Sequence, residues 1–512
     1  MKKTNIIFTG IILFMLSACT KNFEEINTNP NNPPTSDPNY IFNYVTKEAA
    51  GEYGYLGTYN LWHMQRWVMQ TSMVYGNSTM PPYSLFENGR ITNLWDFFYS
   101  DLLLNCHVLV QETAEDPDAA NKHSIAQIWK VYSFHKVTDL WGAVPYFNAW
   151  KLLEEYTDEN LYPIYDSQED IYLDMLSVLK EAAEGIDPSG VMYETDMIFD
   201  GDPKMWVKFA NSLRLRLAVR SGNEAVVSEI IAEDNLIAAT EEGAIFKYID
   251  SENWWNPFYE LNISSKNPSL PEYTGAGVPR ISKLMTDQLQ RTRDPRLAVY
   301  AQPIEQDDVT YRGVPNLMNS SKKENQALKM SVFNTSYIGR YFTENKELEK
   351  QLLSYAEVCF LRSEAAFNGW TSENPQSWYE EGVRSSMEYY NIDPVEIDTF
   401  LLERGAYADS LGQIMTQKWL AMFLDGYEAF ADYRRTGHPQ LMKYDLVLDG
   451  NNKIVDSTWV EVPRSYLPGR LPYPDIEKEL NEESYMNAVE QIGEDDYYQQ
   501  VWWSKKFGEI DY

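Results

Sequence analysis

The stretch DPKMWVKFANSLRLRLAVRSG, from Asp202 to Gly222, indicates most clearly how this chain folds. Asp202 precedes a proline, the pairing expected of an N-cap and a first helical position, and Gly222 supplies a C-terminal stop. Between them, apolar residues recur every three or four positions: Trp206, Phe209, Leu213 and Leu217. This spacing predicts an amphipathic helix with one buried face.

The same helical spacing recurs over most of the chain. It predicts further helices over residues 95–115, 125–140, 167–182, 281–292, 352–367, 376–390, 410–423 and 426–435. Long irregular stretches separate them, at residues 75–93, 245–280, 301–336 and 437–475, although Tyr444–Val462 alternates around a turn and predicts a small β-hairpin. The predicted fold is therefore mostly α-helical with minor β-hairpins.

Residues 1–18 have the pattern of a secretion signal. Two lysines precede an apolar run, Ile6–Leu16, which is too short to cross a hydrocarbon core of ~30 Å. The run ends in Ser17-Ala18-Cys19, the pattern of bacterial lipoproteins, so we predict that Cys19 is acylated and becomes the mature N-terminus. An ordinary cleaved signal is the alternative. Several acyl chains on one residue would anchor the protein stably to a membrane.

Residues 19–38 predict a flexible tether behind this anchor. The stretch Asn27–Pro38 is rich in proline and asparagine and contains no aliphatic side chain, so it lacks the means to form a core. No comparable linker and no sharp change of composition follows Pro38. We therefore expect residues 39–512 to form one folded domain.

The strong negative charge excludes one class of partner. The chain has 43 Lys and Arg against 76 Asp and Glu, a net charge of −33, which becomes −35 when the signal and its two lysines are removed. Such a protein repels phosphate backbones and anionic lipid, so nucleic acid is excluded as a general partner. Besides Cys19 there are only Cys106 and Cys359, which lie in apolar helical patterns and are expected in the core.

The sequence lacks the common catalytic patterns. Its five histidines never form the His-x-x-x-His or His-Glu spacing of a helix-borne zinc site, and no Gly-x-Ser-x-Gly elbow or phosphate-binding glycine loop occurs. A glycosidase needs only two carboxylates that meet in space, so that alternative stays open. We predict a non-enzymatic binding protein with no cofactor and no metal.

Several blocks in a fixed order resemble the SusD/RagB family of nutrient-binding outer-membrane lipoproteins of Bacteroidetes, in particular the SusD-like branch with an Asn-Pro-rich N-terminus. They run from the lipoprotein signal to the C-terminus: NTNPN at 27–31, HKVTDLWGAVPY at 135–146, DPRL at 294–297, FLRSEAA at 360–366, GYEAFADYRRTG at 426–437, PR at 463–464, RLPYP at 470–474 and VWW at 501–503. Within the 426–437 block, Asp432, Arg434 and Arg435 are interpreted as structural residues that pair with helix ends or with acidic partners.

The resemblance implies a fold of divergent tetratricopeptide-like helical hairpins that support a loop-rich face. It also implies that the protein lies at the outer membrane and faces the cell exterior. There it would bind an oligosaccharide or similar nutrient and deliver it to a SusC-like TonB-dependent transporter. A structural or adhesion lipoprotein that binds protein partners through its helical surface is the alternative function.

A glycan site requires exposed aromatic rings beside amide, carboxylate or guanidinium groups, because sugars present both C–H faces and hydroxyls. Two loop segments have this composition, and they contribute the predicted binding residues: Tyr75, Tyr83, Phe86 and Arg90 in the first, and Trp254, Trp255 and Tyr259 in the second. Because neighbouring tryptophans point in different directions, we expect at most one of Trp254 and Trp255 to be exposed. The alternative is that these aromatic side chains cover the helical core and do not bind a ligand.

Overall fold

The computed structural model describes residues 37–510 except for 52–54, 75–87, 252–253, 261–278, 305–306, 308 and 317–326. The predicted signal peptide, Cys19 and nearly all of the predicted tether therefore lie outside the described residues, as do Tyr75, Tyr83 and Phe86. Among the helices that are described, none is both long and apolar enough to cross a membrane.

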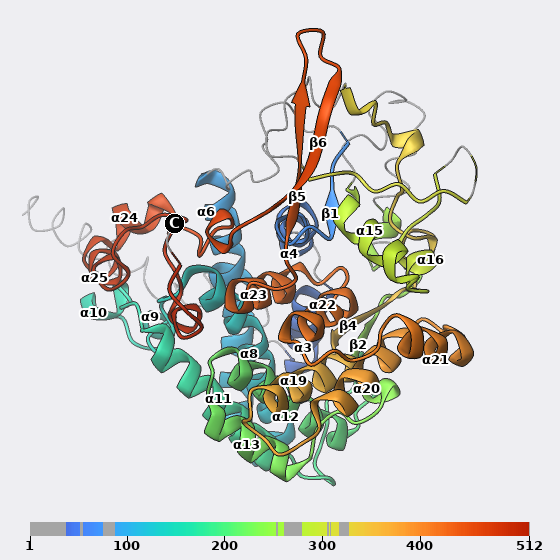
Figure 1. Ribbon diagram of the computed structural model, residues 1–512. Coiled ribbons are helices and arrows are strands. Elements are labelled where there is room, and N and C mark those ends of the chain that lie inside the picture. Colours follow the sequence, from blue (N-terminus) through green and yellow to red (C-terminus); the bar gives the residue numbers. More distant parts are fainter. Residues whose placement is uncertain are drawn as a thin grey trace, which may run out of the picture.

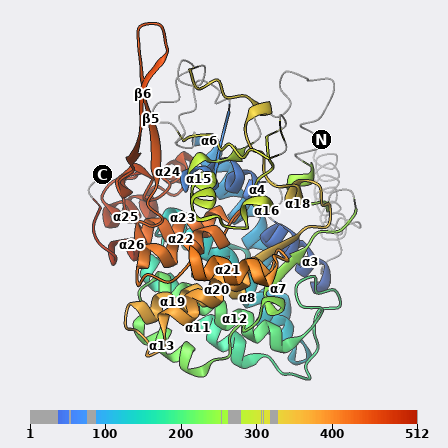
Figure 2. The same cartoon turned by 45° about the vertical axis from the view of Figure 1, so that its right-hand side comes forward.

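Long helices form the body of the molecule. In both Figure 1 and Figure 2 most of them fill the lower half. They pack as consecutive pairs, α7 on α8, α11 on α12, α19 on α20 and α22 on α23, the arrangement expected for tetratricopeptide-like hairpins. These helices and α13 span Leu103–Ala114 (α7), Ala120–Trp141 (α8), Gln168–Gly185 (α11), Pro203–Arg220 (α12), Glu224–Glu233 (α13), Tyr355–Phe367 (α19), Pro375–Glu388 (α20), Leu411–Ala421 (α22) and Gly426–Thr436 (α23).

Shorter helices surround this body. They are α3 (Pro38–Gly51), α4 (Tyr55–Tyr59), α5 (Gln65–Trp67), α6 (Asn88–Phe97), α9 (Lys151–Glu154), α10 (Asp158–Leu161), α15 (Lys283–Thr292), α16 (Leu297–Tyr300), α18 (Arg340–Thr343), α21 (Pro394–Glu403), α24 (Asp475–Leu480), α25 (Glu482–Ile492) and α26 (Trp502–Lys505). Single π-helical or 3₁₀ turns lie at η1 (Asn60–Met64), η2 (Phe98–Leu102), η3 (Pro117–Ala119), η4 (Thr240–Glu242), η5 (Val332–Asn334) and η6 (Arg464–Tyr466).

The predicted helix signals are confirmed at α12. The Asp202 carboxylate accepts a hydrogen bond from the Lys204 amide at 2.9 Å, and Gly222 follows the helix with a φ of +62°. The four apolar residues of the predicted stripe are fully buried. Cys106 and Cys359 are buried and unbridged, in agreement with their expected place in the core.

Strands are few and short in the part of the chain that the structure describes, and each sheet has two strands. The predicted hairpin is present as β5 (Met442–Leu448) and β6 (Ile454–Glu461), and it rises at the top of Figure 1. The other two sheets join distant segments and were not predicted: β1 (Thr71–Ser72) with β3 (Arg280–Ile281), and β2 (Ala244–Lys247) with β4 (Glu349–Leu353). The mostly helical fold class is thus confirmed.

A buried network of charges joins five of the long helices. Arg216 on α12 donates two hydrogen bonds to the Glu357 carboxylate on α19, at 2.7 and 2.6 Å. Arg220, one turn further along α12, lies between Asp139 on α8, at 2.5 Å, and Glu428 on α23. All of these side chains are less than a tenth exposed.

Lys418 on α22 closes the network from the other side. Its ammonium lies 3.1 Å from Glu428 and 2.7 Å from Asp432, and Asp432 is also 3.2 Å from Arg435. Arg435 in turn pairs with Glu364 on α19. The interpretation of Asp432 and Arg435 as structural ion pairs is therefore confirmed. Arg434 instead donates to two backbone carbonyls, that of Asp139 in the last turn of α8, at 2.6 Å, and that of Gly469, at 3.0 Å.

We expect Glu428→Gln to lower the free energy of unfolding by about 3–5 kcal/mol, because it leaves two buried cations without their shared carboxylate. Chemical denaturation followed by circular dichroism measures this loss. The matched control is Asp398→Asn, which breaks an exposed 2.7 Å pair with Arg384 and should cost at most about 1 kcal/mol. Equal losses in the two variants would contradict the role of the network.

Candidate functional site

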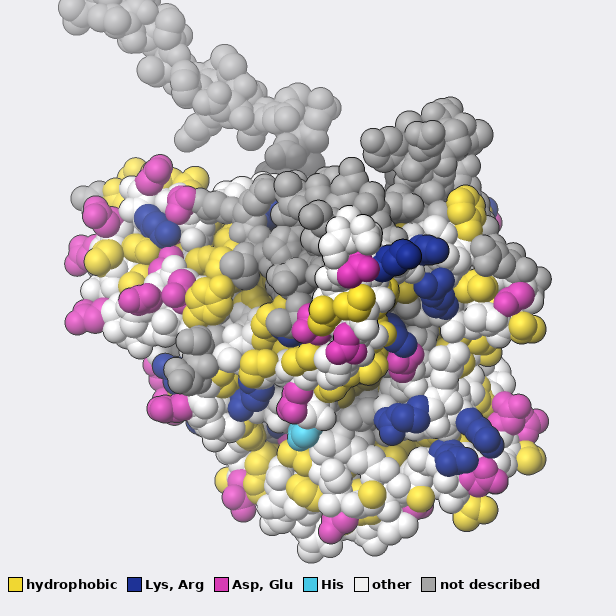
Figure 3. All heavy atoms as spheres, turned by 45° about the horizontal axis from the view of Figure 1, so that its top comes forward, with side chains coloured by type: hydrophobic (Ala, Val, Ile, Leu, Met, Phe, Trp, Pro, Cys, Tyr) yellow, Lys and Arg dark blue, Asp and Glu magenta, His cyan; other side chains and the backbone are white. Residues whose placement is uncertain are grey.

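The side of the molecule opposite the long helices carries the β5–β6 hairpin, β1 and α15 (Figure 1). Figure 3 shows this side from above, with apolar and basic side chains gathered around its centre. Two groups of aromatic side chains with charged partners stand out among the described residues. One lies at the segment predicted from sequence, and the other lies on the hairpin and α15.

The first group, which we call the 250–259 cluster, consists of Asp250, Trp255, Tyr259 and Lys346. The Trp255 and Tyr259 rings meet edge to face, with centroids 5.7 Å apart. The Lys346 ammonium lies 4.7 Å from the Trp255 centroid and 5.7 Å from that of Tyr259. Asp250 accepts hydrogen bonds from the Trp255 indole at 2.8 Å and from Lys346 at 2.9 Å.

A buried asparagine positions this cluster. The Asn256 side chain is completely buried and donates to the Asn345 carbonyl at 3.0 Å, and its backbone amide donates to the Lys346 carbonyl at 2.9 Å. These bonds fix Trp255 beside Lys346. The salt bridge to Lys346, with the indole bond, lowers the pKa of the Asp250 carboxyl, and the same pair raises the pKa of Lys346. Both groups are therefore charged at neutral pH.

The other predicted residues that the structure describes, Trp254 and Arg90, contact different parts of the body. Trp254 is partly buried against the main apolar core, with the Lys47 ammonium 5.2 Å from its ring centroid. Arg90, in the first turn of α6, donates to Nε2 of His63 at 3.3 Å, and its carbonyl accepts from the Tyr59 hydroxyl at 2.6 Å. The structure brings Trp255 and Tyr259 together and places Trp254 and Arg90 elsewhere.

The second group, the hairpin cluster, consists of Lys283, Asp287, Tyr444 and Trp459. Tyr444 and Trp459 are paired across β5 and β6, and their ring centroids are 5.2 Å apart. The Lys283 ammonium on α15 lies 6.0 and 5.5 Å from these two rings and 2.7 Å from the Asp287 carboxylate. The cluster thus repeats the chemistry of the first one.

Sequence reasoning predicted the hairpin but missed this cluster. A register symmetric about the turn at 449–452 would pair Tyr444 with Ser457. The pairing with Trp459 depends on an irregularity between Val447 and Leu448 that shifts the register, and the sequence does not mark it. The approach of Lys283 was not marked either, since α15 lies far from the hairpin in sequence.

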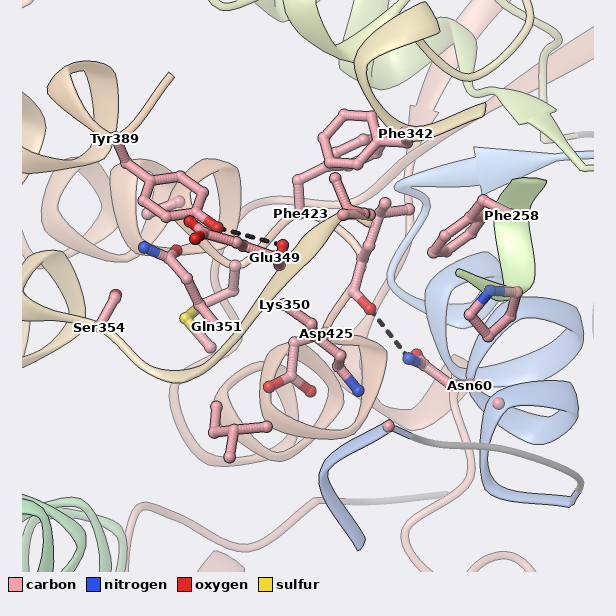
Figure 4. Close-up of a pocket in the computed structure, with 18 of the residues that line it drawn as sticks. Asn60, Phe258, Phe342, Glu349, Lys350, Gln351, Ser354, Tyr389, Phe423 and Asp425 are labelled. Atoms are coloured by element: carbon pink, nitrogen blue, oxygen red, sulfur yellow. Dashed lines mark hydrogen bonds between the residues drawn. The ribbon is translucent and has the colours of Figure 1, made fainter. Parts of the chain in front are cut away.

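A cavity of about 90 Å³ lies behind the 250–259 cluster and includes Phe258 in its wall (Figure 4). Phe342 and Phe423 form much of its apolar lining, and Glu357 lies at one end. Because Glu357 is already paired with Arg216, it is not a free proton donor or acceptor in this cavity. Among the residues that the structure describes, no group of three or more His, Cys, Asp or Glu side chains is placed to hold a metal ion.

Comparison with known proteins identifies the family. Residues 30–459 match the SusD-like family described as starch-binding and associating with the outer membrane. The chain belongs to this family. Among curated proteins, none matches the chain.

Solved structures share the fold. A chitin-binding protein is 24% identical, with a TM-score of 0.73, covering 91% of this chain and 100% of its own. A chitin-binding SusD homologue from Flavobacterium johnsoniae is 23% identical, with a TM-score of 0.71, covering 91% and 98%. A SusD homologue from Bacteroides uniformis is 23% identical, with a TM-score of 0.73, covering 92% and 100%. At these identities the likeness establishes the fold of this SusD-like protein.

The burial of His63 makes stability depend on pH. Burial lowers the pKa of His63 from 6.5 to about 3, assisted by the nearby charges of Arg66 and Arg90. The folded state keeps the ring neutral, whereas the unfolded state binds a proton below pH 6.5. Stability should therefore fall as the pH drops, by about 1.4 kcal/mol between pH 7.5 and 5.5 for this one group.

Urea denaturation at the two pH values, compared with that of His63→Gln, isolates this contribution. The variant should lose about 1.4 kcal/mol less than the wild type over the same interval, because it has no ring to protonate. Parallel pH profiles of the two proteins would contradict it.

Proposed function

We propose that this protein captures a glycan at the cell surface and passes it to a TonB-dependent, SusC-like transporter in the same outer membrane. The observation that carries the proposal is the 250–259 cluster, in which two rings, an ammonium and a carboxylate meet at the surface. Rings pack on the C–H faces of sugars, and charged groups bind the hydroxyls. The family description and the chitin-binding relatives support a polysaccharide fragment as the ligand.

The proposed binding face extends beyond this cluster. The hairpin cluster offers a second platform of the same chemistry, built from β5, β6 and α15. Tyr75, Tyr83 and Phe86 remain predicted contributors from the preceding segment, and Arg90 borders that segment. Binding is non-covalent, and no catalysis is part of the proposal, since the described carboxylates of the two clusters are each paired with a lysine.

We further propose that residues 39–512 act as one binding domain, attached to the outer membrane through acylated Cys19 and the tether of residues 19–38. The folded body then faces the cell exterior, where the ligand arrives. In the alternative function, adhesion, the ligand is a protein. Binding to protein surfaces without any binding of oligosaccharide would favour adhesion.

Trp255→Ala should weaken binding of an oligosaccharide about tenfold, because it removes one ring of the platform, a loss of about 1–2 kcal/mol. Isothermal titration calorimetry with chito- and malto-oligosaccharides of six sugars measures the affinity. Thermal stability should change little, since this partly buried side chain is not among those packed against the main apolar core.

Trp254→Ala is the matched control. Its ring packs against the main core, so its removal should lower the melting temperature more than that of Trp255→Ala and leave affinity nearly unchanged. The opposite ordering, with binding lost only in Trp254→Ala, would reject the 250–259 cluster as the site.

Cys19→Ala should release the protein from the membrane fraction, because a single thiol carries the acyl chains that anchor it. Cell fractionation followed by immunoblotting, with the wild type as control, measures the shift. A variant that still sediments with outer membranes would contradict the proposed anchor.

A further inference from the structure

One part of the surface is unusually apolar. Of the large hydrophobic side chains that are exposed in the described residues, eight lie in two short segments, residues 151–164 and 475–490. They are Leu153, Tyr156, Leu161, Tyr162, Ile164, Ile476, Leu480 and Met486, with exposed fractions between 40% and 80%. We call them the α24–α25 surface.

The two segments lie against each other. Asn481, between α24 and α25, donates to the Pro163 carbonyl at 2.9 Å, and the Tyr165 hydroxyl donates to Glu477 at 2.6 Å. Beside these contacts, a shallow hollow is lined by Ile164 and Tyr165 of one segment and by residues of α25. Figure 1 places α24 and α25 at the left edge of the molecule and α15 on its right-hand side.

The exposed apolar area is large enough for a stable interface. At roughly 200 Å² for a fully exposed large side chain, the eight residues present on the order of 900 Å². One side of a standard protein interface buries about 800 Å² in total. The α24–α25 surface therefore has the size of an interface.

Acidic residues surround this surface. Exposed carboxylates lie along both segments, at Glu154, Glu155, Asp475, Glu479, Glu482, Glu483 and Glu490, and Glu494 follows α25. They outnumber the exposed basic residue at the start of α9, Lys151. The one basic residue of α24 and α25, Lys478, is held by Asp475 at 3.1 Å and Asp495 at 3.4 Å. The left-hand lobe of Figure 3 accordingly shows apolar side chains among mostly acidic ones.

This charge pattern selects the kind of occupant. An acidic rim repels an anionic lipid surface. It also repels a second copy of the chain, because a two-fold interface would bring the same carboxylates together. A protein whose apolar contact patch is bordered by Lys and Arg complements both the apolar centre and the acidic rim of the α24–α25 surface.

We propose that the α24–α25 surface is where the transporter docks, through an apolar patch with a basic rim. The identity of the occupant rests on the proposed function, whereas the position and chemistry of the surface do not. The docking surface and the glycan-binding clusters would then occupy different parts of the molecule. The protein could hold its partner and its ligand at the same time.

The test uses the full-length, affinity-tagged lipoprotein in the bacterium that carries it. The variant is Leu480→Glu with Met486→Glu, which places charge in the apolar centre. The control is Val395→Glu with Leu402→Glu on α21, whose side chains are 72% and 82% exposed outside this surface. The protein is recovered from detergent-solubilised outer membranes, and co-purifying TonB-dependent transporter is identified and quantified by mass spectrometry.

We expect the Leu480/Met486 variant to recover at least about tenfold less transporter than the wild type, and the Val395/Leu402 control to match the wild type within about twofold. Equal recovery in both variants would overturn the proposal, as would recovery of a second copy of the chain in place of the transporter. Melting temperatures of the purified variants should match that of the wild type, which separates lost docking from misfolding.

Oligosaccharide titration of the same purified proteins keeps this inference separate from the proposed function. Unchanged glycan affinity together with lost transporter supports the surface. Glycan binding without any co-purifying transporter in the wild type overturns the docking surface and leaves glycan capture standing. A wild type that recovers transporter but binds no glycan removes glycan capture and leaves the docking surface standing.

Discussion

The structure depends on the buried charge network that α12 forms with α8, α19, α22 and α23. Moving Arg216, Arg220 and Lys418 out of water costs several kcal/mol for each ion unless carboxylates surround them. The carboxylates come from three other helices, α8, α19 and α23, so the cost is offset only when these helices are in place. The network therefore favours one arrangement of helices over other compact ones, in addition to what apolar packing contributes.

Because these charges are paired with one another inside the body, the side chains on the outer faces take no part in the network. The chemistry of these faces can therefore differ from one to the next. On the loop side, the backbone positions aromatic rings beside a lysine and a carboxylate, once through buried Asn256 and once through the register of β5 and β6. At α24 and α25, apolar side chains lie exposed within an acidic border. Both faces differ from an ordinary solvated surface. Such a surface mixes charged and polar groups but rarely gathers aromatic rings or aliphatic side chains in one place.

Local signals in the sequence predicted the helices well, because capping and apolar spacing act between residues three or four apart. The Asp202 cap and the stripe behind it are examples, and the β5–β6 hairpin follows from an equally local turn. The sheets of β1 with β3 and β2 with β4 could not be predicted in this way. Their strands are short and their partners lie far along the chain, so no periodicity marks them. Ile281 and Leu352, assigned to helices from sequence, belong to these strands for that reason.

The same distinction between local and long-range interactions applies to the candidate site. The sequence by itself determined the helices with their caps, the hairpin and the aromatic-rich segment at 254–259, since each follows from neighbouring residues. Only the tertiary structure decided that Trp254 covers the core while Trp255 meets Tyr259 and Lys346, and that Lys283 reaches the hairpin. Adjacent residues with identical side chains differ here because their surroundings come from distant segments. Contacts of that kind exist only once the chain has folded.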